Sequence, residues 1–275
     1  TSIVFPITIV SFAFAWCFGD GAVALMSIRQ GQKDDKSVAK IIGNSIIANV
    51  VAGIIFMLVC YLAMDPLLTL FGASETSLPL AKAYFQIILA ASIPSMMTGA
   101  VTGVIRADGS PKFSMIVTVV GAIIDYFFAL GVYYIFFKSR TFKLKLESFK
   151  FNWNIFWQFT KLGVSTFITQ MSIVVTALVT NMMLAKYGAE SAYGTDIPIA
   201  AMGITMKVLS IMFNIVVGLA VGAQPILGYN YGAGNYARVK QAFRIVTSGA
   251  AIVGVVAMFI FQLFPDLAIN IFGSS

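Results

Sequence analysis

The sequence predicts an all-α protein that crosses a membrane several times. Hydrophobic residues make up 59% of the 275 residues, charged residues make up 11%, and the mean hydropathy is +0.90. A soluble domain holds about 25% charged residues. Seven apolar runs each reach the roughly 20 residues that a helix needs to cross about 30 Å of hydrocarbon. Part of the chain also repeats itself at a fixed spacing, so the fold should contain equivalent groups of helices.

Turn signals separate the apolar runs. Asp65-Pro66 ends the second run, residues 108–111 (Asp-Gly-Ser-Pro) separate the third from the fourth, and residues 196–198 (Asp-Ile-Pro) open the sixth. Proline and glycine at such places end or start helices. The sequence therefore predicts about seven transmembrane helices, over the runs at about 2–28, 41–64, 80–105, 113–137, 155–185, 197–228 and 242–264.

An internal repeat appears when the numbering is shifted by 201. Gly21 then meets Gly222, Gly31 meets Gly232, and 11 of the 54 positions from 21 to 74 are identical. Two apolar helices resemble each other by chance, but the matching glycines and helix-to-loop boundaries are harder to obtain that way. An internal repeat of several helices is typical of transporters, whose substrate sites lie between the repeats.

The second copy of the repeat, residues 222–275, begins within the stretch Gly218–Arg244. This stretch is expected to be the end of a membrane helix, a Gly-rich cytoplasmic turn over Gly228–Gly234, and then three cations. Small residues predict that another helix backbone packs closely here. The four glycines concerned are Gly218, Gly222, Gly228 and Gly232.

Lysine and arginine predict which loops are cytoplasmic. Fifteen of the 18 cations fall in four loops, within residues 29–40, 106–112, 138–161 and 238–244, and the others are Lys82, Lys186 and Lys207. The net charge of +7 is spread over short loops, so it does not indicate a nucleic-acid partner. The four rich loops should lie in the cytoplasm.

This assignment creates a conflict in the first half of the chain. The loops 106–112 and 138–150 both look cytoplasmic, yet only one run, 113–137, lies between them. Either the charge rule fails at 138–150, or one helix is missing near Asp125-Tyr126. The repeat favours a missing helix.

Three motifs resemble the multidrug and toxic compound extrusion (MATE) family. Residues 222–234, GAQPILGYNYGAG, look like the end of the family's eighth helix, and residues 105–111, IRADGSP, are similar to the loop after its fourth. Residues 27–32, SIRQGQ, resemble the loop after its second. The resemblance implies a two-lobed helical bundle with parallel internal repeats, incomplete here: a first lobe at 1–137, a cytoplasmic linker at 138–154 and a second lobe at 155–275. The family's first helix, with its ion-coupling aspartate, and its last three helices have no counterpart.

The resemblance further implies a secondary antiporter of the inner plasma membrane that exports amphipathic or cationic organic compounds in exchange for Na⁺ or H⁺. It would be a monomer in the lipid bilayer, not an enzyme, with no cofactor, metal or nucleic-acid partner. The sequence has no histidine, which excludes histidine metal sites and proton relays, and Cys17 and Cys60 are expected to be buried thiols. Two alternatives remain: a flippase for lipid-linked saccharides of the same superfamily, and a truncated membrane protein that transports nothing.

Polar side chains within the apolar runs are the candidate functional residues. A carboxylate there is costly and usually faces a cavity. Asp20 and Asp125 are therefore candidates for ion coupling, although Asp20 could equally be a structural residue between glycines. The amides Gln170, Asn181 and Gln224 and the cation Lys207 are candidates for the substrate cleft, whereas amides more often bond across helices and a lysine can snorkel. Asn44 and Asn49 are expected to be such interhelical amides.

Overall fold

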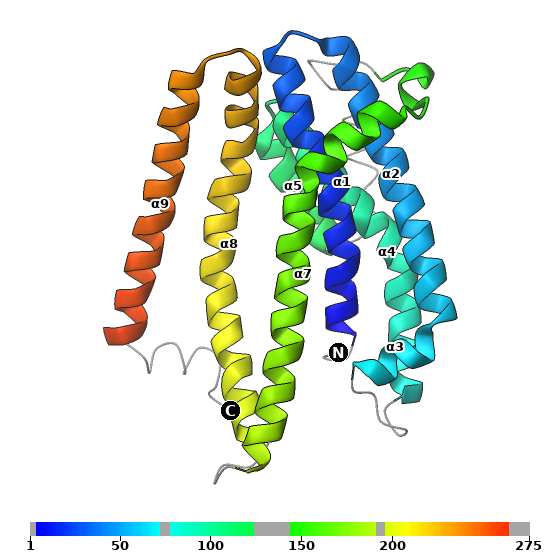
Figure 1. Cartoon of the computed structure of the whole chain (residues 1–275), viewed down its shortest axis with the longest axis vertical. Coiled ribbons are helices and arrows are strands. Elements are labelled where there is room, and N and C mark those ends of the chain that lie inside the picture. The colour runs from blue at the N-terminus through cyan, green and yellow to red at the C-terminus, as the bar shows by residue number, and fades with distance from the viewer. Residues whose placement is uncertain (1–3, 72–77, 124–143, 191–195, 264–275) are drawn as a thin grey trace. The chain divides into compact units, whose positions relative to one another are not determined.

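A computed structural model describes residues 4–71, 78–123, 144–190 and 196–263, and this part of the chain is helical (Figure 1). Six of its helices are long and apolar enough to cross a membrane, which confirms the predicted all-α polytopic fold. The remaining run, 113–137, is described only as far as residue 123, and Asp125 lies outside the described residues. The elements are α1 (Phe5–Gly31), α2 (Asp35–Leu62), α3 (Met64–Leu70), α4 (Leu78–Ala107), α5 (Pro111–Ile123), η3 (Leu146–Phe149), α7 (Trp153–Ala189), α8 (Asp196–Gly232) and α9 (Tyr236–Leu263).

The turn signals were confirmed except at one place. Helix α4 ends at Ala107 and α5 begins at Pro111, and α8 begins at Asp196, as predicted. The predicted Gly-rich turn over Gly228–Gly234 was wrong, because α8 continues through Gly228 to Gly232. The glycines at 228 and 232 serve close helix packing, and the turn itself is confined to residues 233–235.

The chain divides into two compact units, each of which is described by itself. The first contains Thr1–Val174 and Gly228–Gly234, and the second contains Val175–Leu227 and Asn235–Ser275. In the first unit α1, α2 and α4 pack against one another around a core that includes Met26, Ile42 and Ile105, with α5 against α4. In the second unit α8 and α9 leave many large apolar side chains exposed, as expected of surfaces in lipid.

Helices α1 and α7 cross with their backbones in contact. A Cβ placed on Gly21 would fall on the carbonyl of Phe159, and a Cβ on Gly163 would fall on the carbonyl of Cys17. This reciprocal pair of glycines is the small-residue packing that membrane helices use in place of a hydrophobic driving force. The crossing fixes the start of α7 across α1.

The linker before α7 is tied to α2 by one buried amide. Asn44 Oδ1 accepts a hydrogen bond of 2.6 Å from Asn152 N, and Asn44 Nδ2 donates to the carbonyls of Lys40 and Lys150. A Cβ on the neighbouring Gly43 would fall on the carbonyl of Ser148, so η3 lies directly on α2. Asn44 was predicted to bond across helices, but its partners are its own helix and the linker before α7.

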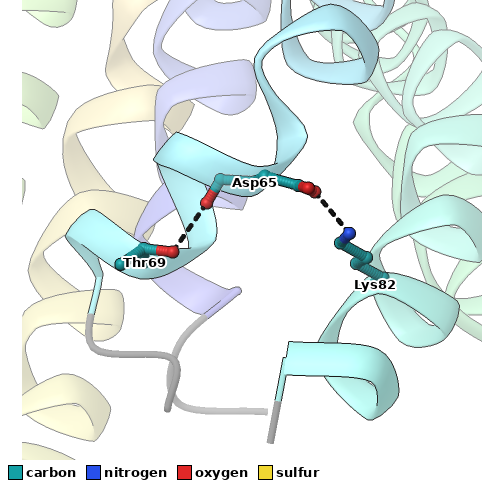
Figure 2. A network of polar contacts seen from close by, with 3 residues as sticks. All are labelled: Asp65, Thr69 and Lys82. Atoms are coloured by element: carbon teal, nitrogen blue, oxygen red, sulfur yellow. Dashed lines mark hydrogen bonds and ion pairs between the residues drawn. The ribbon is translucent and has the colours of Figure 1, made fainter. Parts of the chain in front are cut away.

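The far end of the first unit carries a lysine that is already neutralised. Lys82 Nζ lies 2.7 Å from Asp65 Oδ1, and this ion pair joins the start of α4 to α3. The hydroxyl of Thr69 donates to the backbone carbonyl of Asp65 (Figure 2). An exposed pair of this kind contributes about 0–1 kcal/mol. Its effect here is to remove net charge from the end that the lysine distribution predicts to be outside the cell.

The loops around 108 and 147 lie at the same end of the first unit. Helix α4 approaches its last turns beside the second half of α1, where a Cβ on Gly103 would lie 2.7 Å from Val23 Cγ2. Element η3 packs near the start of α2, which follows α1 through a short turn. Both loops therefore lie at the end of the α1–α2 turn, as their charges predict. Loops on one side of a membrane are separated by an even number of crossings, and the single predicted run at 113–137 does not supply one.

Candidate functional site

The internal repeat extends to helix boundaries and turn geometry. Helices α1 and α2 correspond to the second part of α8 and to α9, and the shift of 201 maps Gly31 onto Gly232, Asp35 onto Tyr236 and Leu62 onto Leu263. The turns match as well: Lys33 has φ +61° and its equivalent Gly234 has φ +76°. Equivalent backbone hydrogen bonds close both turns, from Lys33 N to Gln30 O and from Gly234 N to Tyr231 O. The predicted repeat is confirmed by these equivalent structures.

The ends of the two copies meet within the first unit. A Cβ on Gly31 would fall on the backbone of Tyr229, and a Cβ on Gly232 would fall on the backbone of Ile28, which is the residue equivalent to Tyr229. Between them, a Cβ on Gly228 would lie 2.6 Å from the Cβ of its own equivalent, Ser27. A contact that is reciprocal and places equivalent residues face to face indicates a local two-fold axis. The copies therefore close against each other at this end.

A cavity of about 190 Å³ lies in the first unit between α1, α2 and α4. Three phenyl rings and several hydroxyl groups line it. Thr8, Ser11 and Ser92 donate their hydroxyl protons to carbonyls of their own helices, so the oxygen lone pairs remain available as acceptors. Rings and acceptor oxygens together suit a ligand that is apolar and cationic. The rings belong to Phe12, Phe56 and Phe85.

This cavity could not be predicted from the sequence, because serine and threonine are common in membrane helices. The signal that was present is the spacing of three between Thr8 and Ser11 and between Ser92 and Ser95, which places each pair on one helix face. That spacing also fits ordinary hydrogen bonding to the backbone, so it would not have singled out these residues.

Asp20 lies in α1 and interacts electrostatically with Arg106 at the end of α4. Both side chains are partly buried, and the Nε atom of Arg106 is fully buried without a hydrogen-bond partner in the described part of the chain. From the sequence alone, Arg106 was expected to be only a loop cation. The structure instead gives the buried carboxylate a positively charged neighbour, an arrangement typical of charges inside membranes.

The other predicted site residues are divided between the units. Gln170 belongs to the first unit and is partly exposed on α7, and Gln224 belongs to the second unit and is partly exposed just before Pro225 of α8. Asn181 in α7 and Lys207 in α8 fall within described helices, but the structure does not describe their side chains. These four residues stay predictions as parts of a cleft.

Among the described residues, Cys17 and Cys60 are buried free thiols, as predicted. Asn49 is completely buried and donates to the carbonyl of Ser45 in its own helix, whereas its Oδ1 atom has no partner within the described residues. The interhelical hydrogen bond predicted for Asn49 is therefore not found within the described part of the chain.

The MatE family model matches residues 1–130 and 165–275. The chain belongs to the MatE family. It is accordingly a multi-pass membrane protein, as predicted. Among curated relatives, the multidrug export protein MepA of Staphylococcus haemolyticus (strain JCSC1435) is 25% identical over 94% of this chain, and MepA of Staphylococcus aureus (strain N315) is 24% identical over 94%. In both cases the match spans 61% of the relative's length.

The match with the S. haemolyticus protein also bears on the internal helix count. The alignment is 284 positions long and includes 94% of the 275 residues of this chain. At about 26 positions the relative therefore has a residue and this chain has none. One membrane span needs roughly 20 residues. The gaps are therefore large enough, taken together, for the helix that the loop charges predict to be missing.

Solved structures share the fold. A crystal structure of MATE in the bent conformation gives a TM-score of 0.86 at 18% identity, covering 98% of this chain and 65% of that one. An outward-facing multidrug resistance MATE transporter of the MOP superfamily gives 0.87 at 18% identity, covering 98% and 66%. A MOP superfamily transporter from Pyrococcus furiosus, described as having a binding pocket of reverse polarity, gives 0.88 at 18% identity, covering 99% and 65%. The predicted MATE-type helical fold is confirmed.

Proposed function

We propose that this protein takes part in the export of amphipathic cationic compounds by alternating access. The observation that carries the proposal is the duplicated helix–turn–helix whose two copies close reciprocally at Gly31 and Gly232. Transport by parallel repeats requires one repeat to move against the other around a substrate site. The names of the multidrug export relatives support the same activity. The lobes at 1–137 and 155–275, with the linker at 138–154, are the bodies that we propose to move.

The cavity in the first unit supports the substrate class. Its rings and acceptor oxygens favour a cation with an apolar body, and the described residues that line it include no carboxylate. At about 190 Å³ it is smaller than the roughly 300–1,000 Å³ of drug-sized sites. We propose that it holds one aromatic portion of a substrate, while Gln170, Asn181, Lys207 and Gln224 contact the remainder in the cleft.

We also propose that Asp20 couples export to Na⁺ or H⁺. A carboxylate beside Arg106 can exchange that partner for an ion, because a bound cation or proton satisfies the carboxylate in place of the guanidinium. Asp20→Asn should keep the volume of the side chain and remove the exchangeable charge. Export should then fall at least tenfold and lose its dependence on the ion gradient, with unchanged protein in the membrane. Asp125 is proposed for the same role.

The experiment is efflux of a cationic dye, ethidium, from preloaded cells of a bacterial strain without its own multidrug exporters. The proposal expects energy-dependent dye loss that an uncoupler or removal of the sodium gradient abolishes. Phe12→Ala, which removes a ring of the cavity, should weaken export of ethidium more than Phe243→Ala on α9, an exposed phenylalanine away from the cavity lining. Dye retention equal to that of empty cells, at normal protein levels, would identify a non-transporting protein. Movement of a labelled saccharide lipid instead would identify a flippase.

A further inference from the structure

The junction between the linker and α7 presents exposed aromatic rings. Phe151, Trp153 and Trp157 form this aromatic surface, with exposed fractions of 48%, 60% and 45%. Neighbouring rings of the surface lie 5.7–5.8 Å apart between centroids. Phe156 stacks behind Trp153 at 5.2 Å and reaches the buried Phe159. The aromatic surface is therefore anchored to the core on one side and open on the other.

Exposed lysines from two elements lie beside this surface. Asn44 Nδ2 bonds the carbonyls of both Lys40 and Lys150, at 2.8 and 3.2 Å, so the backbones of these two lysines lie next to each other. Both side chains are exposed, as is that of Lys145 just before η3. We call these three residues the lysine group. Glu147 is the acidic residue between Lys145 and Lys150, so the local charge is positive.

The lysine group and the aromatic surface are held in place by buried contacts. Asn44 has no exposed surface and bonds the linker at Asn152 N, one residue before Trp153. Asn152 Oδ1 in turn accepts from the backbone amides of Asn154 and Ile155 and so fixes the first turn of α7. Arg29 of α1 donates a hydrogen bond of 3.0 Å to Gln158 Oε1, close to the start of α7. Binding here would cost little ordering of the chain.

Helix α7 is longer than one membrane crossing requires. With 37 residues and a rise of about 1.5 Å per residue, the helix is roughly 55 Å long, against about 30 Å of hydrocarbon. Figure 1 shows its first turns lying obliquely across α1, close to the end where the α1–α2 turn lies. Tryptophan prefers the headgroup region, because the ring is apolar and the indole N–H needs a polar partner.

We propose that the aromatic surface and the lysine group together bind the headgroup of an anionic phospholipid in the cytoplasmic leaflet. The ammonium groups of Lys40, Lys145 and Lys150 pair with the phosphate as point charges. The rings of Trp153 and Trp157 pack along the glycerol region and the first methylenes of the acyl chains. A basic surface near the cytoplasmic ends of membrane helices is a recognised kind of site for anionic lipids.

Tryptophan fluorescence can test this directly, because two of the three tryptophans lie in the proposed site. In a Trp16→Phe background, Trp153 and Trp157 are the only reporters. The protein is reconstituted in phosphatidylcholine vesicles that contain increasing fractions of phosphatidylglycerol with brominated acyl chains, which quench nearby indoles. A parallel series uses brominated phosphatidylcholine. The proposal expects quenching by the anionic lipid to saturate at a fraction several times lower than quenching by the zwitterionic lipid.

A pair of double variants separates a site from general charge. Lys40→Gln with Lys150→Gln removes two charges from the lysine group, and because each lysine contributes up to about fivefold, the preference for the anionic lipid should be lost. The control is Lys82→Gln with Lys186→Gln, which removes one charge near the start of α4 and one near the end of α7. It should leave the preference for the anionic lipid unchanged. Helical circular dichroism verifies folding of each variant. Equal quenching by both lipids in the parent protein, or an equal loss in both double variants, overturns the proposal.

Discussion

Gly31 and Gly232 occupy equivalent positions in two copies of one helix–turn–helix, and each lies against the backbone of the other copy. Because the contact is reciprocal, the same change at either residue should have the same effect. Both residues are at helix ends, so the contact joins the turn ends of the two copies. A transporter that alternates its access must break this contact in every cycle.

A methyl group at Gly232 should hold the two copies apart. The Cβ of Gly232→Ala would fall on the backbone of Ile28, and relief of such overpacking costs about 1–3 kcal/mol. Ser27 is completely buried at this contact, so a Ser27→Cys reporter should be protected in the parent and react with a thiol reagent in Gly232→Ala. Cys17 and Cys60 are replaced with alanine in both proteins.

Gly31→Ala should expose the same reporter to a similar degree, because it is the symmetric change. Gly222→Ala is the matched control on α8, since its Cβ meets no described atom within 4 Å. It should leave Ser27→Cys protected. Equal labelling in the parent, Gly232→Ala and Gly222→Ala would show that the glycine contact does not hold this end closed.

Asn44 should contribute more to stability than Asn49, although both are completely buried asparagines of α2. Asn44→Leu leaves Asn152 N and the carbonyl of Lys150 without their partner, and an unsatisfied buried polar group costs about 1–3 kcal/mol. Asn49→Leu removes only a bond within its own helix and an already unpaired Oδ1. Thermal unfolding in detergent should rank the parent and Asn49→Leu above Asn44→Leu, and hydrogen exchange should rise at residues 150–152 only in the latter. The reverse ranking would contradict the role of Asn44 in holding the linker on α2.

Asp34 should give the α1–α2 turn a pH dependence that the α8–α9 turn lacks. Hydrogen bonds from Ser37, and then the charges of Arg29 and Lys40, hold the pKa of Asp34 below its ordinary value. The stabilisation is therefore complete above the unfolded pKa of about 3.9 and is lost as pH falls through the lower folded pKa. The equivalent residue, Asn235, does not titrate.

Asp34→Asn gives the α1–α2 turn the asparagine that the α8–α9 turn has at the equivalent position. The variant should show a weaker dependence of stability on pH. Asparagine is as good a helix N-cap as aspartate, so the variant should lose less than about 1 kcal/mol near neutral pH. The stability difference between the parent and the variant should then shrink below pH 4. Melting temperatures of both proteins from pH 6 to pH 2.5 measure it. If the melting temperatures of the two proteins differ by a constant amount over that range, Asp34 is not the titrating residue of this turn.

Helix positions could be predicted from the sequence because the membrane demands long apolar runs bounded by polar residues. The repeat was also visible, since Gly31 and Gly232 recur with their flanking boundaries. The extent of α8 was not predictable from composition, because glycine both ends helices and permits close packing. Gly228 permits close packing and does not end α8, and only its contact with Ser27 shows this.

The candidate site was less accessible to prediction. Asp20 stood out as a charge in an apolar run, but its neighbour Arg106 is 86 positions away and looked like a loop residue. The cavity is lined by residues from three helices, and nothing in the order of the chain brings Thr8, Phe56 and Ser92 together. Side chains that meet only through packing leave no local pattern in the sequence.

The final prediction concerns the side of the membrane on which the two basic loops lie. Five lysines and arginines within 138–150 against Glu147 make that segment hard to translocate, and the structure places η3 at the same end as the loop after α4. Cysteine labelling should therefore find positions 112 and 147 on one side, in the cytoplasm. Both side chains are exposed there, whereas Ser148 is buried and would resist a reagent from either side.

The measurement uses an impermeant thiol reagent added outside intact cells, in a background without Cys17 and Cys60. Lys112→Cys and Glu147→Cys should be protected until the cells are opened. Lys186→Cys, one span further along α7 and exposed, should react at once and shows that the reagent reaches the protein. Labelling of Glu147→Cys from outside would place the linker on the wrong side of the membrane. It would then refute the even number of crossings between the loops, and with it both the missing helix and the lipid site in the cytoplasmic leaflet.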